Sequence, residues 1–265
     1  MFHEEQRCYF SNENLTLKNS FSKVVEENQY STHIHSGFEV IYLLGGSVTY
    51  GFEGKEIKLS KGDILITPPF RYHYLNVDNN VNYERLNILF YPEKFDFDLK
   101  LNGIVVFNDD SHIVYKIINQ IKYYCDFANP DDYSFIFELK IKELCYALAS
   151  NFSSGTEVNT LVYDKTVRNI LEYINDNIYK NISIADIAKH CYLSEGHVNH
   201  VFKKQFKTSP INYIKMKKLS IAQKLLLSKV TPTEVAERLG YEDYSVFYRN
   251  YLRFYNKKPS DDYRK

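Results

Sequence analysis

Short apolar runs with strand-like alternation fill the chain between about residues 30 and 91. Glycine and proline pairs such as Gly45-Gly46 and Pro68-Pro69, and the single residues Gly54 and Gly62, separate these runs. The runs are VIYLL, SVTYGF, KEIKLS, DILIT and YERLNILFY. Closely spaced short strands predict a small β-sandwich or barrel.

The period of the apolar positions changes to a helical one after about Ser111. Two helical stretches are expected, split near Ala128-Asn129-Pro130. Their predicted buried stripes are Ile113, Ile117, Ile118 and Ile121, and then Phe135, Leu139, Leu144 and Leu148. The polar stretch NFSSGTEVNT follows and has the composition of a linker. We therefore expect a barrel domain over residues 1–110, a helical region over 111–151, a linker over 152–163 and a second domain over 164–265.

Strong helix-start signals punctuate this second domain. Ser183 with Asp186, Ser209 with Pro210, and the run Thr231 to Glu234 each combine a capping oxygen with a proline or an acid. The run Thr231 to Glu234 is expected to form a complete capping box. The pattern predicts helix pairs over about 182–206 and 231–255, joined by a linking helix over about 210–227. The domain is therefore all-α, and the whole chain is predicted to be an α+β protein.

Each helix pair has an apolar side and an outward polar side, which is the layout of a helix-turn-helix. Gly240 permits the turn in the second pair. The apolar positions are Ile184, Ile187, Ala188, Cys191, Val198, Val201, Phe202 and Phe206, and then Val235, Ala236, Leu239, Phe247 and Tyr251. The residues expected to contact DNA are Ser194, Gly196, Asn199, His200, Lys203 and Lys204, and then Tyr244, Ser245, Tyr248, Arg249 and Arg253.

Charge divides the chain at the same place as the pattern does. The formal net charge is zero, but residues up to Tyr163 hold 14 Lys+Arg against 22 Asp+Glu, and the remainder hold 19 against 11. The two parts therefore carry about −8 and +8. Phosphate neutralisation requires a local positive field, so the basic part suits a polyanion such as DNA.

The cysteines and the amino terminus indicate where the protein works. Cys8, Cys125, Cys145 and Cys191 are far apart and have no metal-site spacing, which argues against a disulfide framework and a thiolate zinc site. The start of the chain has no apolar signal segment, and no stretch approaches about 18 consecutive apolar residues. A cytoplasmic protein that does not associate with membranes is expected.

Residues of the second domain match a known family in order and spacing. These are Asp186-Ile187-Ala188, Leu193-Ser194, Val201-Phe202-Lys203, Ala222, Glu234-Val235-Ala236, Gly240-Tyr241, Phe247 and Pro259 with Tyr263-Arg264-Lys265. With them, the segment from about Ile182 to Lys265 resembles the DNA-binding domain of AraC/XylS-type transcription regulators. The resemblance implies two recognition helices in successive major-groove segments, roughly 34 Å apart. His200 and Lys218 stand where arginine is common and Asn256 where glycine is usual, so the resemblance does not imply which bases are read.

The barrel region resembles the two motifs of the cupin barrel. His33, His35 and Glu39 occur in HIHSGFE, and His73 ends GDILITPPFRYH. In cupins, three histidines and a glutamate can hold a divalent metal such as Fe, Mn, Ni or Zn. Phe70 stands where the second motif usually has glycine. Three interpretations remain open: a metal site of these four residues, a metal-free effector pocket, and structural histidines. The expected effector pocket consists of His33, His35, Glu39, Tyr42, Arg71 and His73.

Together the two resemblances predict a sequence-specific, promoter-binding transcription regulator, either an activator or a repressor. A small-molecule effector, such as a sugar or a related metabolite, is expected to control it through the cupin-like barrel. The resemblance also implies a homodimer formed through the helices of 111–151, and RNA polymerase as a further partner. Covering the barrel is an equally expected role for these helices, and the two roles are compatible. No cofactor is required, although a divalent metal is compatible with the barrel. The alternative is a metal-dependent cupin enzyme or metal sensor that uses His33, His35, Glu39 and His73.

Overall fold

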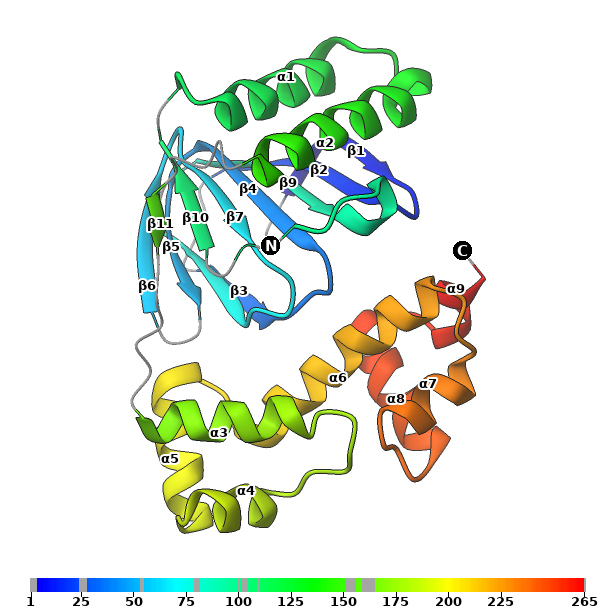
Figure 1. The fold of residues 1–265 in the computed structure, drawn as a ribbon. Coiled ribbons are helices and arrows are strands. Elements are labelled where there is room, and N and C mark those ends of the chain that lie inside the picture. Colours follow the sequence, from blue (N-terminus) through cyan, green and yellow to red (C-terminus); the bar gives the residue numbers. More distant parts are fainter. Residues whose placement is uncertain are drawn as a thin grey trace. The chain divides into compact units, whose positions relative to one another are not determined.

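Two β-sheets form the amino-terminal part of the chain (Figure 1). The computed structural model describes residues 4–23, 28–52, 55–78, 82–99, 101, 104–108, 110–150, 156–158 and 165–264. The strand order is β1-β2-β9-β4-β7-β10-β11 in the larger sheet and β3-β8-β5-β6 in the smaller. The strands are β1 (Glu4–Ser11), β2 (Leu15–Ser22), β3 (Asn28–His33), β4 (Phe38–Gly45), β5 (Ser47–Phe52), β6 (Lys55–Ser60), β7 (Ile64–Thr67), β8 (His73–Val77), β9 (Tyr83–Phe90), β10 (Ile104–Phe107) and β11 (Thr156–Val158). This arrangement confirms the predicted all-β amino-terminal domain.

Strands β1 and β2 precede the region in which strands were expected. They form an antiparallel hairpin, and β2 pairs with β9 along its whole length. Leu15 and Leu17 of β2 are fully buried, but the rest of the hairpin is mostly polar. An edge hairpin with this composition gives little apolar alternation, which explains why the sequence pattern did not predict it.

Two helices cover one face of the larger sheet (Figure 1). They are α1 (Ile113–Phe127) and α2 (Tyr133–Ala149). Of two short 3-10 turns, η1 (Pro92–Phe95) precedes β10, and η2 (Pro130–Asp132) lies between the two helices. Buried residues of both helices form one apolar core with alternate residues of β2, β4 and β9. This core follows from strand alternation, because every second side chain points toward the helices.

The buried faces of these helices differ from the predicted stripes at three positions. Ile113 is 39% exposed, Phe135 76% and Leu139 52%. The buried side of α2 instead consists of Phe137, Ile141, Leu144, Cys145, Ala147 and Leu148. Apolar residues lie on two sides of α2, so periodicity could not indicate which side faces the sheet.

The range expected to be a linker contains a strand. β11 pairs antiparallel with β10, with Ile104 opposite Val158. The other residues of 152–163 lie outside those described.

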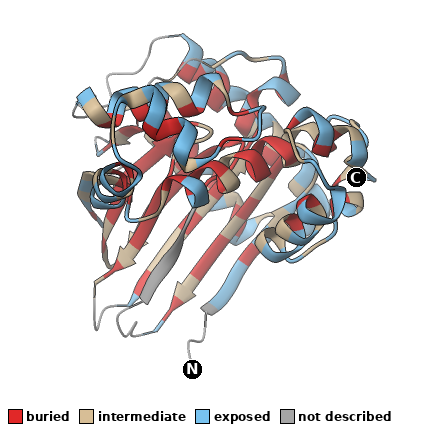
Figure 2. Ribbon diagram, turned by 90° about the horizontal axis from the view of Figure 1, so that it is seen from below, coloured by how far each residue is buried: buried red, intermediate tan, exposed pale blue. Residues whose placement is uncertain are grey.

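The chain divides into two compact units, one holding most residues up to Thr160 and the other all residues from Leu161 onward. The second unit is helical, as predicted, and its helices contain both buried and exposed residues (Figure 2). Its helices are α3 (Lys165–Asp176), α4 (Ile184–Cys191), α5 (Glu195–Phe206), α6 (Pro210–Leu227), α7 (Pro232–Arg238), α8 (Tyr244–Tyr255) and α9 (Pro259–Tyr263). Among the helices described in either unit, none is long and apolar enough to cross a membrane.

Side-chain caps set where these helices begin. Ser183 and Asp186 form a complete capping box at α4, and the hydrogen bonds from Ser183 lower the pKa of Asp186. Thr231 accepts a hydrogen bond from the Glu234 amide at 3.4 Å. The side chain of Glu234 instead pairs with Arg238, which leaves the predicted box at Thr231 half formed.

The two helix pairs meet at a buried lysine on α6. The Lys218 ammonium group donates hydrogen bonds to the carbonyl oxygens of Lys180 (2.6 Å) and Leu239 (2.7 Å). Gly240 has φ +68°, and a Cβ there would lie 2.8 Å from the Tyr179 carbonyl oxygen. Only glycine fits both the backbone conformation and the close approach. These contacts fix the turn between α7 and α8 against the loop that precedes α4.

Candidate DNA interface and barrel interior

The first helix pair, α4 and α5, is held together by an apolar side as predicted. Ile187 and Ala188 of α4 are buried, and so are Val198, Phe202 and Phe206 of α5. Helix α4 ends at Tyr192, which has φ +57° and is 94% exposed. Ser194 then caps α5 by accepting a hydrogen bond from the His197 amide at 3.2 Å. The amino-terminal end of α5, which follows this turn, is therefore exposed.

The outward face of α5 agrees with the sequence prediction, except at Asn199. The exposed residues of this helix and its cap include Ser194, Gly196, His200, Lys203 and Lys204. Asn199 is half-buried, and its amide donates to the Glu195 carbonyl oxygen at 3.1 Å. His197 is also exposed and was not predicted. Its spacing of three and seven residues from His200 and Lys204 places it on the same face, and that spacing is visible in the sequence.

The second helix pair, α7 and α8, repeats this design. Asp243 caps α8 by accepting from the Ser245 amide at 2.7 Å, and this bond together with the nearby charge of Arg249 lowers the pKa of Asp243. Phe247 and Tyr251 form the buried side. The exposed residues are Tyr244, Ser245, Val246, Arg249, Leu252 and Arg253, of which Val246 and Leu252 were not predicted. Tyr248 is half-buried, with its ring 6.3 Å from that of Tyr244.

Basic side chains on the exposed faces of α5 and α8 are available to bind an anion. Lys203, Lys204, Arg249 and Arg253 are exposed, and none makes an ion pair with any residue that the structure describes. Phosphate contacts need this kind of uncommitted lysine and arginine. The arrangement can therefore hold a polyanion against α5 and α8.

A buried polar cluster is formed by residues of both sheets. Glu39 on β4 and His73 on β8 are 5% and 1% exposed, and Oε2 of Glu39 lies 3.2 Å from Nε2 of His73. Asn87 on β9 donates to the other oxygen of Glu39 at 2.6 Å. The ring of Tyr50 stacks on His73 at 5.5 Å, and its hydroxyl forms a hydrogen bond with Thr67.

The protonation of His73 follows from its neighbours. Its Nδ1 lies 2.8 Å from the Arg71 carbonyl oxygen, which can only accept, so Nδ1 carries a hydrogen. Nε2 of a neutral ring would then present a lone pair to the Glu39 carboxylate. A cation between the two groups would make this contact favourable.

The predicted effector pocket is assembled only in part. His35, Glu39 and His73 come together, Arg71 is half-buried, and the side chain of His33 lies outside the described residues. Tyr42 lies on the opposite face of β4, where its hydroxyl donates to Asn119 of α1 at 3.0 Å. The prediction that Tyr42 lines the effector pocket was wrong, because residues 39 and 42 on one strand point to opposite faces.

Sequence reasoning also missed part of the interior. Arg85, Asn87, Tyr50 and Thr67 share it with Glu39 and His73. The signal for two of them was present in YERLNILF, where Arg85 and Asn87 alternate with apolar residues that face the helices. Tyr50 and Thr67 become neighbours only through pairing between distant strands.

The donor set suits a divalent cation. His35, Glu39 and His73 each offer one ligand atom, and these atoms lie within 4.8 Å of one another. The hydrogen bond from His73 Nδ1 to a carbonyl is the usual support for a metal-binding imidazole. Two imidazoles and one carboxylate fit a transition metal such as Fe, Mn or Zn.

Comparisons with known proteins identify the amino-terminal domain and the helical domain separately. A family model described as an AraC-like ligand binding domain matches residues 25–110, and one described as a helix-turn-helix domain matches residues 187–265. The chain is 21% identical to the lactose operon transcription activator of Staphylococcus xylosus, over 82% of this chain and 80% of that protein. It is also 21% identical to the uncharacterized HTH-type transcriptional regulator YdiP of Escherichia coli, over 86% and 79%. The multiple antibiotic resistance protein MarA of Escherichia coli is 30% identical over 36% of this chain and 75% of MarA.

Proposed function

Since the chain belongs to the AraC family of transcription regulators, we propose that it activates a promoter by placing α5 and α8 in two successive major-groove segments. The observation that carries this proposal is the pair of exposed helix faces with uncommitted cations, both attached to the continuous helix α6. RNA polymerase is the partner that activation requires.

The effector is a small polar metabolite bound inside the barrel. Glu39, His73, Asn87 and Arg85 supply donors and acceptors there, a set that suits the hydroxyl groups of a sugar. The name of the Staphylococcus xylosus relative, a lactose operon activator, points to the same class of ligand. Effector binding shifts the populations of DNA-competent and incompetent forms.

Gel-shift titration tests the DNA-binding proposal. The probe is the DNA upstream of the protein's own gene, compared with a shuffled sequence of equal length and composition. We expect salt-sensitive binding that favours the upstream DNA by at least tenfold. Equal affinity for the two probes would contradict sequence-specific recognition.

A metal sensor is the second candidate, and the cluster of His35, Glu39 and His73 favours it. A cation there would be coordinated by one ligand atom from each of the three side chains. Metal analysis of protein purified without chelators distinguishes the two candidates, with His73→Ala as the test variant and the exposed His200→Ala as its control. Stoichiometric metal in the unmodified protein and in His200→Ala, but not in His73→Ala, would establish the sensor. A metal-free protein that still responds to a sugar would exclude it.

The chain is also proposed to act as a homodimer through α1 and α2. Phe127, Phe135, Leu139 and Tyr146 are 52–76% exposed on these helices. Large apolar side chains at this density on two adjoining helices are unfavourable in water and favour self-association.

A further inference from the structure

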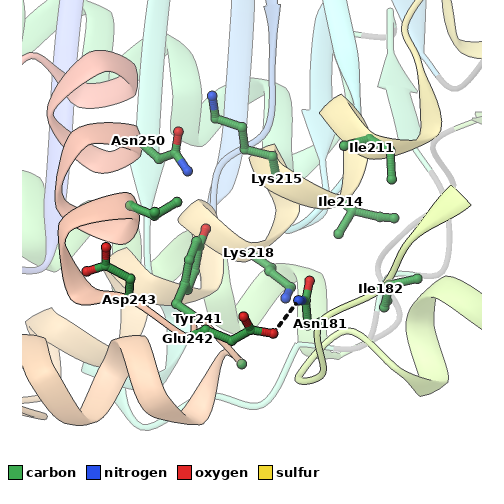
Figure 3. A pocket seen from close by; sticks show the side chains of 12 residues that line it. Asn181, Ile182, Ile211, Ile214, Lys215, Lys218, Tyr241, Glu242, Asp243 and Asn250 are labelled. Carbon is green, nitrogen blue, oxygen red and sulfur yellow. Dashed lines mark hydrogen bonds between the residues drawn. The ribbon is translucent and has the colours of Figure 1, made fainter.

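A cavity lies within the helical unit, far in sequence from the barrel. Its volume is about 400 Å³, and it lies between α6, the start of α8 and residues 181–182 (Figure 3). This volume falls in the range of small-molecule pockets in proteins. The effector proposal uses none of its residues.

Most polar groups of this cavity are already satisfied. Glu242 accepts a hydrogen bond from the Asn181 amide at 2.9 Å, and Asp243 caps α8. Lys218 donates to two carbonyl oxygens. These groups line one end of the cavity.

The other end presents two donors without partners. Figure 3 shows Lys215 of α6 and Asn250 of α8 at this end. Both are half-buried, and neither side chain makes a hydrogen bond or ion pair with a residue that the structure describes. Burial and the charge of Arg253 lower the pKa of Lys215. An anion beside Lys215 would offset both effects.

Apolar side chains form the wall between these ends. Ile182, Ile211 and Ile214 lie along one side of the cavity in Figure 3, and Val246 also lines it. Ile211 is 44% exposed and Val246 40% exposed. A DNA phosphate could satisfy Lys215, but it would not cover these side chains. A ligand with an apolar body would cover them and gain from their burial.

We propose that this cavity is a second ligand site, which binds a small monocarboxylic acid with an apolar body through Lys215 and Asn250. The carboxylate accepts hydrogen bonds from these two side chains, and the body lies against the isoleucines. Because Asn250 and Val246 belong to α8, such a ligand contacts the proposed recognition helix directly. It therefore alters DNA affinity without passing through the barrel.

The test uses the full chain with ¹³C-labelled isoleucine methyl groups, titrated with 4-phenylbutyrate and, as the uncharged counterpart, 4-phenyl-1-butanol. We expect saturable NMR shifts at Ile182, Ile211 and Ile214 with the acid, and at least tenfold weaker binding of the alcohol. Lys215→Met should weaken acid binding at least tenfold, whereas Lys229→Met, at an exposed loop lysine, should leave it unchanged. Asn250→Leu is a second variant, which keeps the test valid if Lys215→Met fails to fold.

Three results would overturn the proposal. The first is acid binding that both Lys215→Met and Asn250→Leu retain within twofold. The second is a set of shifts confined to barrel isoleucines. The third is an absence of acid-induced shifts combined with an even loss of DNA affinity in Lys215→Met, which would identify Lys215 as a phosphate contact. DNA binding without the acid is measured separately, so failure of this site leaves the promoter proposal standing.

Discussion

At the scale of single residues, position along the two proposed recognition helices distinguishes a base contact from a phosphate contact. Arg249 lies in the first half of α8 near Asp243, where a planar guanidinium can reach a base edge. Lys203 lies in the last turn of α5, nearer the flank, where a point charge meets phosphate. The two cations therefore should not be equivalent.

Replacing each cation by alanine tests this difference. Arg249→Ala should weaken binding to the specific site by about 1–3 kcal/mol and leave binding to random DNA nearly unchanged. Lys203→Ala should weaken binding to both DNAs to a similar extent. Fluorescence anisotropy with both probes at one salt concentration measures the effects. If both variants lose affinity evenly, Arg249 does not read bases.

Gly196 gives a second prediction at this scale. A Cβ at Gly196 would meet nothing within 4 Å, and the residue lies in the first turn of the proposed recognition helix α5. Gly196→Ala should raise the free energy of unfolding by about 0.5–1 kcal/mol, because alanine favours helix. It should also weaken DNA binding, because the open space admits the DNA backbone. Urea denaturation and anisotropy measure the two effects, and a variant that gains stability with unchanged affinity would show that DNA does not approach there.

At the scale of helices and strands, periodicity predicted elements well when one face was apolar. The helix pairs, the linking helix and five strands appear where the pattern placed them. The pattern missed β1 and β2, which are mostly polar, and it predicted α2 but not its buried face, because α2 has two apolar faces. For the candidate site, alternation could group Glu39 with other residues of β4, but only strand pairing brings Asn87 and Thr67 to it. Long-range pairing has no local signal in one sequence.

Lys218 provides a prediction about the junction of the helix pairs. Lys218→Met keeps the length of the side chain but leaves the carbonyl oxygens of Lys180 and Leu239 without their donor. We expect a loss of about 2–4 kcal/mol in the free energy of unfolding. The adjacent Lys217→Met is the control. The Lys217 ammonium group makes an exposed hydrogen bond to Asn175 and lies 6.0 Å from the Tyr213 ring, so its loss should cost less than about 1 kcal/mol. Equal losses would mean that the junction does not depend on Lys218.

At the scale of the whole molecule, the exposed side of α2 determines the expected oligomeric state. Leu139→Glu places a charge in the middle of the apolar surface formed with Phe135 and Tyr146. This change should convert the dimer to a monomer and leave the melting temperature of the monomer nearly unchanged. Ser134→Glu adds the same charge at an exposed position outside that surface and should remain dimeric. Sedimentation velocity distinguishes the outcomes, and a dimeric Leu139→Glu protein would place the interface elsewhere.

The junction at Lys218 and Gly240 also limits how far apart the two half-sites of a target promoter can lie. The two proposed recognition helices, α5 and α8, are joined through α6, an unbroken helix of 18 residues that is about 27 Å long. In the proposed mode of binding, this rigid helix holds the spacing between them constant. Inserting about five base pairs between the two half-sites would turn one of them to the opposite side of the duplex. Promoters of this regulator should therefore tolerate base substitutions between the half-sites far better than insertions or deletions, and a search for its targets can hold the spacer length constant.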